Sequence, residues 1–328
     1  MSESTPLRAG VLGVGSMGEN HARVYDDVPE TALTGVFDVD RARAEQVADR
    51  YGTRAMGREE LLDAVDVVSI AVPTAYHYDM AAACIRQGVH VLVEKPFVAE
   101  PEAGRELAAL AAANDVTVQV GHVERFNPAV DVLRDVVEDL DVVSVTARRL
   151  GPPPDREIHD TAVMDLMIHD VDVVMDLVDG DLTACDAVGA AEGRYATGTL
   201  AFDSGVVGTL TASRVTPEKV RELTVSTLDC RVTVDYIDQT VAVHRVASPE
   251  VAADGGHGQG ETLVERVPVD QGEPLKREVR SFAEAVTTGT EPVVPPADGL
   301  AVLEVTRALD RAAAETPTDG SVVDARTE

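Results

Sequence analysis

The sequence lacks tryptophan altogether and contains little cysteine and little lysine. Its 328 residues include three cysteines, at positions 84, 185 and 230, which are odd in number and far apart. They predict no disulfide framework and suit a reducing compartment. No apolar run is long enough to cross a bilayer, and residues 1–9 lack the apolar core of a signal peptide. We therefore expect a cytoplasmic protein that does not enter a membrane.

Positive charge is also scarce. The chain has 28 lysines and arginines against 58 aspartates and glutamates, a net charge of -30, and the acids are dispersed along it. This composition is typical of cytosolic proteins of salt-accumulating halophiles, where a Debye length of about 3 Å at molar salt screens the self-repulsion. A surface of this sign excludes nucleic acid as a partner. Hydrophobic residues still make up 45% of the chain, which predicts a packed core rather than disorder.

A glycine motif follows the first apolar segment. Residues 9–12 predict a short strand that leads into the G-x-G-x-x-G sequence Gly13-Val14-Gly15-Ser16-Met17-Gly18 and then into a helix. In such a motif the first glycine permits a tight turn, the second lets backbone approach a pyrophosphate, and the third lets the helix pack on the strand. The motif therefore predicts a cofactor-binding loop made by Gly13, Gly15, Ser16, Met17 and Gly18.

Strands and helices continue to alternate after this loop. A strand over 33–37 ends at Asp38, twenty residues after Gly18. That carboxylate is placed to accept hydrogen bonds from ribose hydroxyls and would repel a 2′-phosphate, so we predict NAD rather than NADP. Further strands and helices predict a doubly wound parallel sheet, with strands over 66–72, 89–93 and 117–120 and helices over 76–87 and 101–114.

Lys95 stands in Glu94-Lys95-Pro96, at the end of a predicted buried strand. Open α/β sheets bind ligands at the carboxyl ends of their strands, so we expect Glu94 and Lys95 to contact the cofactor. Pro73, Thr74 and His77 follow another strand and are predicted to line the same crevice. Lysine, unlike arginine, has a pKa that can be tuned. A solvated salt bridge at Glu94 and Lys95, and a surface or helix-capping role for His77, are the alternatives.

A helix predicted over 161–178 carries Asp165 and His169 at i and i+4, on one face. The carboxylate could orient the imidazole, and histidine is the usual shuttle for a hydroxyl proton. Asp172 and Asp176 extend the same stripe, but no second histidine or cysteine stands at a ligand spacing, so no metal site is predicted. An acidic solvated helix face is the alternative, although the apolar neighbours of Asp165 and His169 indicate burial.

Together these features resemble the Gfo/Idh/MocA family of sugar and polyol oxidoreductases. The resemblance spans nearly the whole chain and rests on Gly13 to Gly18, Pro73-Thr74-Ala75-Tyr76-His77, Glu94-Lys95-Pro96 and Asp165 to His169. It implies a Rossmann domain followed by an α/β domain with a large open, mainly antiparallel sheet. It also implies a nicotinamide cofactor, with Lys95 and His169 at the reacting carbon and Asp165 beside His169. In many relatives the bond before the matching proline is cis.

A shorter resemblance concerns the substrate. Residues 121–128, which read Gly-His-Val-Glu-Arg-Phe-Asn-Pro, and the segment Gly151-Pro152-Pro153-Pro154 are similar to the branch that contains UDP-N-acetylglucosamine 3-dehydrogenases. Many relatives carry a glycine pair shortly before the acid that matches Asp165, and this chain does not. Arg125 would suit a substrate phosphate, because its planar fork binds oxyanions, with an interdomain salt bridge as the alternative.

The second half of the chain predicts a sheet-rich domain. Strands are expected over 142–149, 184–191, 197–202, 206–213, 221–227, 231–236 and 241–246, and helices over 276–287 and 297–314. The glycine-rich stretch 254–260 predicts a mobile loop. We expect an NAD-binding Rossmann domain at 1–121, a substrate-binding and oligomerisation domain at 122–315 and an acidic, disordered tail at 316–328. An open sheet leaves an apolar face to cover, which favours a homodimer or homotetramer.

Two functions of different class fit these residues. The first is an NAD-dependent dehydrogenase acting on a ring hydroxyl of a sugar or nucleotide sugar, with His169 as the base, Asp165 orienting it and Lys95 stabilising the alkoxide. The second is a non-catalytic dinucleotide sensor of the same fold, since a fold does not guarantee chemistry. The presence of Lys95, Asp165 and His169 together favours the enzyme. With Arg125, these three residues are also the predicted substrate contacts.

Overall fold

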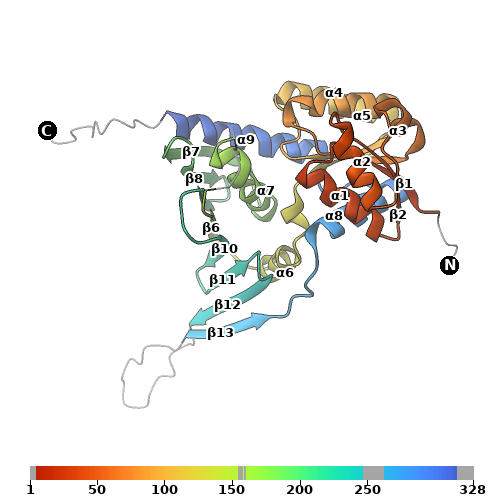
Figure 1. Cartoon of the computed structure of the whole chain (residues 1–328). Coiled ribbons are helices and arrows are strands. Elements are labelled where there is room, and N and C mark those ends of the chain that lie inside the picture. The colour runs from red at the N-terminus through yellow and green to blue at the C-terminus, as the bar shows by residue number, and fades with distance from the viewer. Residues whose placement is uncertain (1–4, 154–157, 159, 247–261, 316–328) are drawn as a thin grey trace, which may run out of the picture. The chain divides into compact units, whose positions relative to one another are not determined.

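The computed structural model describes residues 5–153, 158, 160–246 and 262–315, and their contacts divide the chain into two compact units (Figure 1). The first unit comprises Met1–Pro128 and Gln271–Glu304, and the second comprises Ala129–Asp270 and Val305–Glu328. The predicted boundary after residue 121 lies close to the end of the first stretch, whereas the return of Gln271–Glu304 to the first unit was not predicted. The glycine-rich stretch 254–260 and the tail 316–328 lie outside the described residues.

The described part of the first unit is built on five parallel strands in the order β2-β1-β3-β4-β5. The central strands are almost entirely buried, as expected of a parallel sheet whose faces are both covered by helices. This confirms the predicted Rossmann architecture. The strands are β1 (Leu7–Leu12), β2 (Thr31–Phe37), β3 (Val67–Ile70), β4 (His90–Glu94) and β5 (Val118–Gly121), and the helices between them are α1 (Ser16–Asp27), α2 (Arg41–Arg50), α3 (Arg58–Ala64), α4 (His77–Arg86) and α5 (Pro101–Asn114).

Two of these helices, α2 and α3, were not predicted. Their sequences are dominated by charged residues, so they give little hydrophobic periodicity. Asp40 caps the amino end of α2, where its carboxylate accepts from the N–H groups of Ala42 and Arg43 at 3.1 and 3.3 Å. An aspartate at this position is a usual start signal for a helix and could have located α2.

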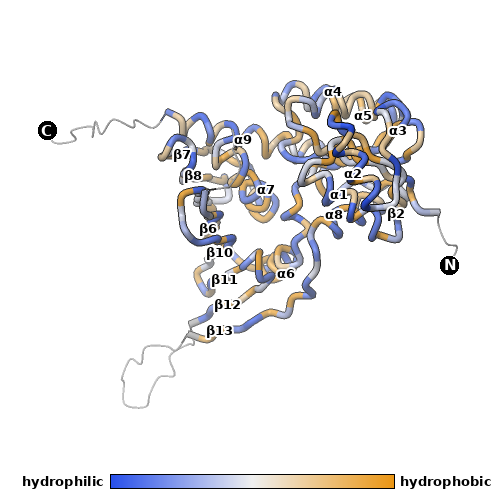
Figure 2. The backbone as a smooth tube through the Cα atoms, viewed as in Figure 1, coloured by the Kyte–Doolittle hydropathy of each residue, from blue (hydrophilic) through white to orange (hydrophobic). Residues whose placement is uncertain are grey.

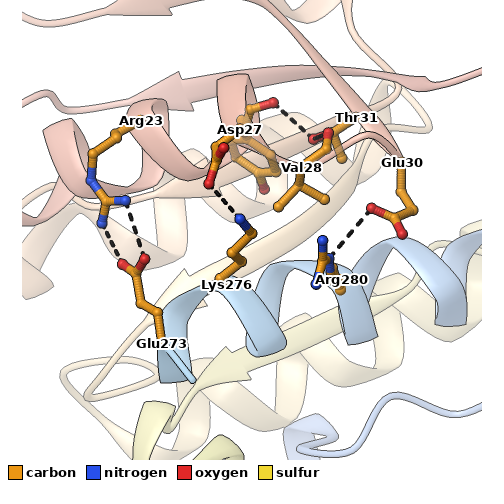
Figure 3. A network of polar contacts seen from close by, with 9 residues as sticks. Arg23, Asp27, Val28, Glu30, Thr31, Glu273, Lys276 and Arg280 are labelled. Carbon is orange, nitrogen blue, oxygen red and sulfur yellow. Dashed lines mark hydrogen bonds and ion pairs between the residues drawn. The ribbon is translucent and has the colours of Figure 1, made fainter. Parts of the chain in front are cut away.

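Helix α8 (Pro274–Thr288) joins the first unit although it lies far along the chain. Val279 and Phe282 of α8 share a buried cluster with Val24 and Tyr25 of α1. Figure 3 shows charged side chains of the two segments pointing toward one another, where they form the ion pairs Arg23–Glu273, Asp27–Lys276 and Glu30–Arg280. Exposed pairs stabilise by up to about 1 kcal/mol each. The buried apolar side chains therefore supply most of the attachment of α8 to α1.

The described part of the second unit contains an eight-stranded sheet in the order β13-β12-β11-β10-β6-β9-β8-β7. Neighbouring strands are antiparallel except β6 and β9, which are parallel. This confirms the predicted large, mainly antiparallel sheet. Its strands are β6 (Val142–Leu150), β7 (Leu182–Ala190), β8 (Tyr195–Phe202), β9 (Val207–Ser213), β10 (Val220–Thr227), β11 (Cys230–Asp235), β12 (Thr240–Val246) and β13 (Thr262–Val267).

The two faces of this sheet differ in composition. Gly198, Leu200 and Phe202 of β8 are buried, while Thr199 is exposed and Ala201 is half-buried, which is the period-two alternation of a half-buried strand. On the outer face the hydroxyls of Thr197 and Thr211 lie 3.3 Å apart across β8 and β9. Around these positions the outer face therefore carries threonine rather than large apolar side chains, and the expected homo-oligomer stays a prediction.

Three helical elements accompany this sheet: α6 (Pro128–Val137), a π-helical turn η3 (Val163–Met167) and α7 (Ile168–Leu177). The final helix, α9 (Pro296–Ala314), has residues in both units. Neither α6 nor β13 was predicted. Figure 2 shows hydrophobic and hydrophilic residues along α6, and Val130, Leu133 and Val137 are buried, a spacing typical of an amphipathic helix. Within the described ranges, no helix is long and apolar enough to cross a membrane.

Candidate active site

The loop between β1 and α1 has the geometry that its glycines predict. Gly13 has a φ of 85°, in the left-handed region, and its N–H donates to the carbonyl oxygen of Phe37 at 2.8 Å. A Cβ on Gly18 would lie 1.7 Å from the carbonyl oxygen of Gly13, so only glycine fits there. A Cβ on Gly15 would meet no protein atom within 4 Å. The loop is therefore open beside Gly15, where the motif brings backbone close to a pyrophosphate.

Ser16 and Met17 are the first residues of α1. The first N–H groups of a helix have no acceptor within the helix, and the helix dipole makes this end attractive to phosphate. The open space at Gly15 and these N–H groups together fit the diphosphate of a dinucleotide. Contacts of Ser16 and Met17 with a cofactor stay predictions.

Asp38 follows β2 and is buried against the same loop. Its Oδ2 accepts from the N–H of Val14 at 2.9 Å, and its Oδ1 accepts from the N–H of Asp40 at 2.8 Å. The guanidinium of Arg43 lies 3.5 Å from Oδ2. Asp38 thus holds the glycine loop in place, and its predicted contact with a ribose stays a prediction.

His77, at the start of α4, ties two loops together. Its Nε2 lies 2.9 Å from the carbonyl oxygen of Val72, and its Nδ1 lies 2.9 Å from that of Pro96. Burial lowers the pKa of His77, while the bonds to these carbonyls act in the opposite direction. The loop after β3 that His77 holds includes Pro73, which is exposed, and Thr74, which is half-buried. Cofactor contacts of all three residues stay predictions.

Glu94 and Lys95 stand at the carboxyl end of β4, and the Lys95–Pro96 peptide bond is cis. One carboxylate oxygen of Glu94 lies 2.9 Å from Nε2 of His21, and the other accepts from the N–H of Lys95 at 3.2 Å. Burial raises the pKa of Glu94, but the hydrogen bond and charge of His21 and the charge of Lys95 outweigh burial and hold the pKa below its usual value. Glu94 is therefore an ionised carboxylate directly beside half-buried Lys95.

His122 and Arg125 extend this cluster beyond the end of β5. His122 is buried, and burial together with the charges of Arg125 and Lys95 lowers the pKa of His122 to about 3. Arg125 is also buried, and its Nη1 lies 3.1 Å from a carboxylate oxygen of Asp298. This ion pair lies within the first unit, and the predicted phosphate contact of Arg125 stays a prediction. His122 was not among the predicted site residues, although it follows β5 as Lys95 follows β4.

In the second unit Asp165 lies in the π turn η3 and His169 lies in the first turn of α7. The unbroken α-helix predicted over 161–178 is therefore corrected, and π turns occur frequently at functional sites. Arg214, which follows β9, donates from Nη2 to a carboxylate oxygen of Asp165 at 2.6 Å and from Nη1 to the carbonyl oxygen of Asp160 at 2.5 Å. Arg214 was not predicted from the sequence. It places a guanidinium beside Asp165, four residues before the half-buried His169.

Two other acids of this helix, Asp170 and Asp176, form ion pairs. Asp170 binds Arg149 through two bonds of 2.8 and 3.0 Å, and Asp176 lies 2.6 Å from Arg134. Across the residues that the structure describes, no group of three or more histidines, cysteines or acids is arranged to hold a metal ion.

Two family models match the chain. The model described as an oxidoreductase family with an NAD-binding Rossmann fold matches residues 7–122, and the model described as the GFO/IDH/MocA C-terminal domain matches residues 141–234. These matches cover the parallel sheet of the first unit and much of the sheet of the second.

Individual proteins match over most of their length. A UDP-N-acetylglucosamine 3-dehydrogenase of Acidithiobacillus ferrooxidans is 32% identical over 286 residues, which cover 85% of this chain and 88% of that protein. A solved structure of that enzyme superposes with a TM-score of 0.85 over 94% of this chain and 100% of the other, at 29% identity. A scyllo-inositol 2-dehydrogenase (NAD(+)) of Bacillus subtilis is 27% identical over 321 residues, covering 91% and 92% of the two chains.

Proposed function

The chain belongs to the Gfo/Idh/MocA family of oxidoreductases, and from this premise we propose that it is an NAD-dependent dehydrogenase that oxidises a ring hydroxyl of a nucleotide sugar. The observation that carries the proposal is the cluster of charged and titratable side chains beyond β4 and β5. Glu94, Lys95, His122 and Arg125 gather there, at the sheet edge where open α/β folds bind ligands. A ring hydroxyl needs a hydride acceptor, a proton acceptor and a positive charge near the developing alkoxide.

A nicotinamide dinucleotide, when bound, supplies the hydride acceptor. The residues proposed to hold it are the glycine loop from Gly13 to Gly18, Asp38, and the loops that follow β3 and β4. We propose NAD over NADP because Asp38 directly follows β2, beside the glycine loop, and its carboxylate would repel a 2′-phosphate. Arg43 lies 3.5 Å from Asp38 but is already paired with that carboxylate.

Lys95 is the proposed stabiliser of the alkoxide. The backbone N–H of Lys95 donates to Glu94. Burial, together with the positive charges of Arg125 and Lys95, keeps the neighbouring His122 neutral. An ammonium held in a partly buried site stabilises negative charge more strongly than one in water. A neutral His122 adds no competing positive charge that would draw the alkoxide away from Lys95.

His169 is the proposed acceptor of the hydroxyl proton. Asp165, paired with Arg214, stands four residues before it and is proposed to orient the imidazole and to stabilise its protonated form. A base that starts neutral near physiological pH suits this task. The three residues Asp165, His169 and Arg214 all belong to the second unit.

UDP-N-acetylglucosamine is the substrate we propose to test first. The relative from Acidithiobacillus ferrooxidans that carries this name is 32% identical over 85% of this chain. Arg125 is buried and presents a planar fork that can bind a phosphate oxygen, in competition with Asp298. An inositol is the second candidate, because the Bacillus relative covers 91% of this chain.

The test is NADH formation in molar potassium chloride, with NAD and either UDP-N-acetylglucosamine, free N-acetylglucosamine or inositols. We expect turnover with the nucleotide sugar, and Lys95→Ala is expected to lower kcat by about 100-fold, the typical loss of one charge-stabilising donor. Lys219→Ala is the matched control, since Lys219 is an exposed lysine of the second unit. Unchanged kcat in Lys95→Ala, with NADH affinity intact, would refute the role of Lys95. Turnover with an inositol or free sugar alone would refute the nucleotide-sugar assignment.

A further inference from the structure

A chain of four buried polar side chains runs from Glu94 into the core of the first unit. Nε2 of His21 lies 2.9 Å from Oε1 of Glu94, Nδ1 of His21 lies 3.0 Å from the hydroxyl of Ser69, and that hydroxyl lies 2.8 Å from the hydroxyl of Tyr25. His21, Ser69 and Tyr25 are completely buried, and Glu94 is 9% exposed. The mechanism proposed above uses Glu94 but leaves the other three without a role.

The carboxylate fixes the direction of the first hydrogen bond in this chain. An ionised carboxylate can only accept, so Nε2 of His21 donates to Glu94. Nδ1 of His21 bonds the Ser69 hydroxyl, and the Ser69 and Tyr25 hydroxyls bond each other, each hydroxyl being able to donate or accept. Both ring nitrogens of His21 therefore have a partner, and Ser69 holds the side of the ring that faces away from Glu94.

The chain joins three elements that carry the proposed site. His21 lies on α1, three residues after Gly18 of the glycine loop, Ser69 lies on β3, and Glu94 ends β4 immediately before Lys95. Because the second carboxylate oxygen of Glu94 accepts from the N–H of Lys95, a rotation of this carboxylate would release the peptide of Lys95. A residue that holds Glu94 therefore also holds the backbone of Lys95, through the carboxylate of Glu94.

We propose that His21, its ring held in orientation by Ser69 and Tyr25, is a positioning residue that holds the ionised carboxylate of Glu94 and through it the backbone of Lys95. The inference rests on the proposed role of Lys95 in the reaction. His21 does not touch the substrate, so it is not a catalytic residue. It links the helix that begins at the cofactor loop to the residue that stabilises the alkoxide.

The charges around Glu94 predict what happens when His21 is lost. Burial raises the pKa of Glu94 and is the largest influence on it, while His21 and then Lys95 lower it. His77 and His122, both buried, are further titratable groups that interact with Glu94. Without His21 the effect of burial dominates, so the carboxyl of Glu94 takes up a proton at higher pH than in the wild type.

The experiment uses two variants. His21→Leu removes both ring nitrogens of His21 but keeps most of the side-chain volume. Ser69→Ala keeps the hydrogen bond from His21 to Glu94 but removes the hydroxyl that bonds the other ring nitrogen of His21. A readout independent of turnover is the carboxyl ¹³C signal of Glu94 in protein labelled at the glutamate side chains, assigned by its absence in Glu94→Gln. We expect this signal to titrate at higher pH in His21→Leu than in wild type. Kinetics should show kcat reduced by about 10-fold or more with KM within threefold, as misplacement of a reacting group predicts.

Two further variants separate positioning from general damage. His21→Gln keeps an N–H donor for Glu94 and is expected to recover part of the lost kcat. His90→Gln is the matched control: His90 starts the same strand, β4, and its Nδ1 accepts from the N–H of Thr117 at 2.9 Å, at the opposite end from Glu94. Its kcat and the Glu94 signal should match the wild type.

Two results would overturn the proposal. A Glu94 signal that titrates identically in wild type and His21→Leu would show that His21 does not hold the carboxylate, whatever the kinetics. A Glu94 titration that moves while kcat stays unchanged would show that the carboxylate does not position Lys95. Failure of the proposed function is read from a different variant, since it appears as unchanged turnover in Lys95→Ala. If His21→Leu does not fold, Ser69→Ala gives the same two readouts with a smaller expected change.

Discussion

Three glycines at helix starts allow the dinucleotide site to be tested apart from the fold. Gly15 and Gly57 are the N-cap residues of α1 and α3, with φ of −67° and −68°, and neither Cβ would meet a protein atom within 4 Å. Gly18, in contrast, would place a Cβ 1.7 Å from the carbonyl oxygen of Gly13. Alanine at these positions should therefore separate three effects: helix capping, closeness of packing and space for a ligand.

Gly15→Ala is predicted to fold almost normally but to bind NADH poorly. Replacing an N-cap glycine by alanine costs on the order of 1 kcal/mol or less, because φ and ψ at Gly15 are allowed for alanine. The added methyl group occupies the side of the loop where backbone must approach the pyrophosphate, so we expect the Kd for NADH to rise at least about 10-fold, or about 1.4 kcal/mol. Gly57→Ala, the matched control, should lose similar stability and keep its NADH affinity.

Gly18→Ala is predicted to destabilise the fold itself. Its methyl group would overlap the backbone of Gly13, which cannot rotate away like a side chain, so the cost should reach or exceed the roughly 1–3 kcal/mol typical of overpacking. Unfolding in urea measures the free energy of unfolding of the three glycine variants. NADH emission measures cofactor binding, and no indole fluorescence interferes because the chain has no tryptophan. Unchanged NADH affinity in Gly15→Ala, or wild-type stability in Gly18→Ala, would refute this reading of the loop.

Two predictions concern buried charge. Arg149 and Asp170 are 4% and 2% exposed and are joined by two hydrogen bonds. Arg149→Met leaves the carboxylate of Asp170 buried without this partner, so it should lower the free energy of unfolding, measured in urea, by about 3–5 kcal/mol. The double variant Arg149→Met with Asp170→Leu should recover most of the lost stability. Burial lowers the pKa of His122 from 6.5 to about 3 in the folded protein. Between these pH values unfolding takes up a proton at this residue. The free energy of unfolding therefore falls by about 1.4 kcal/mol for each unit that the pH is lowered. His122→Gln should therefore flatten the dependence of unfolding free energy on pH in this range by about one proton, and an unchanged slope would contradict burial of a neutral His122.

Most of the fold was accessible from the sequence because its strands are either continuously apolar or strictly alternating. The run that forms β4 and the alternation of β8 need only local information, and helix α5 begins and ends where Pro101 and Asn114 predicted. Helix α2 was missed because its charged residues give no periodic signal, and its capping aspartate was not used. The π turn before α7 was missed because a sequence pattern does not separate a π turn from the first turn of an α-helix.

The sequence predicted the positions of candidate residues that follow strands, and it did not predict the contacts between residues far apart in the chain. Lys95 and Asp38 stand directly after apolar runs, so position in sequence gave their place. Arg214 reaches Asp165 across 49 residues, and His21 reaches Glu94 across 73, so only the folded chain pairs them. A signal for His21 did exist: it stands four residues before Tyr25, which puts two polar side chains on the face of α1 that the core buries.

The distribution of the two cationic residue types supports a chemical role for Lys95. The buried cations of the described residues are arginines, and each is paired with a carboxylate: Arg125 with Asp298, Arg149 with Asp170, and Arg214 with Asp165. Arginine suits such pairs because its fork binds two oxygens and does not lose its proton. Lys276 is half-buried and pairs with the exposed Asp27, and Lys219 is exposed. In a chain that uses arginine wherever a fixed buried charge is needed, a half-buried lysine at the end of β4 is better explained by a need for a compact cation that can share a proton.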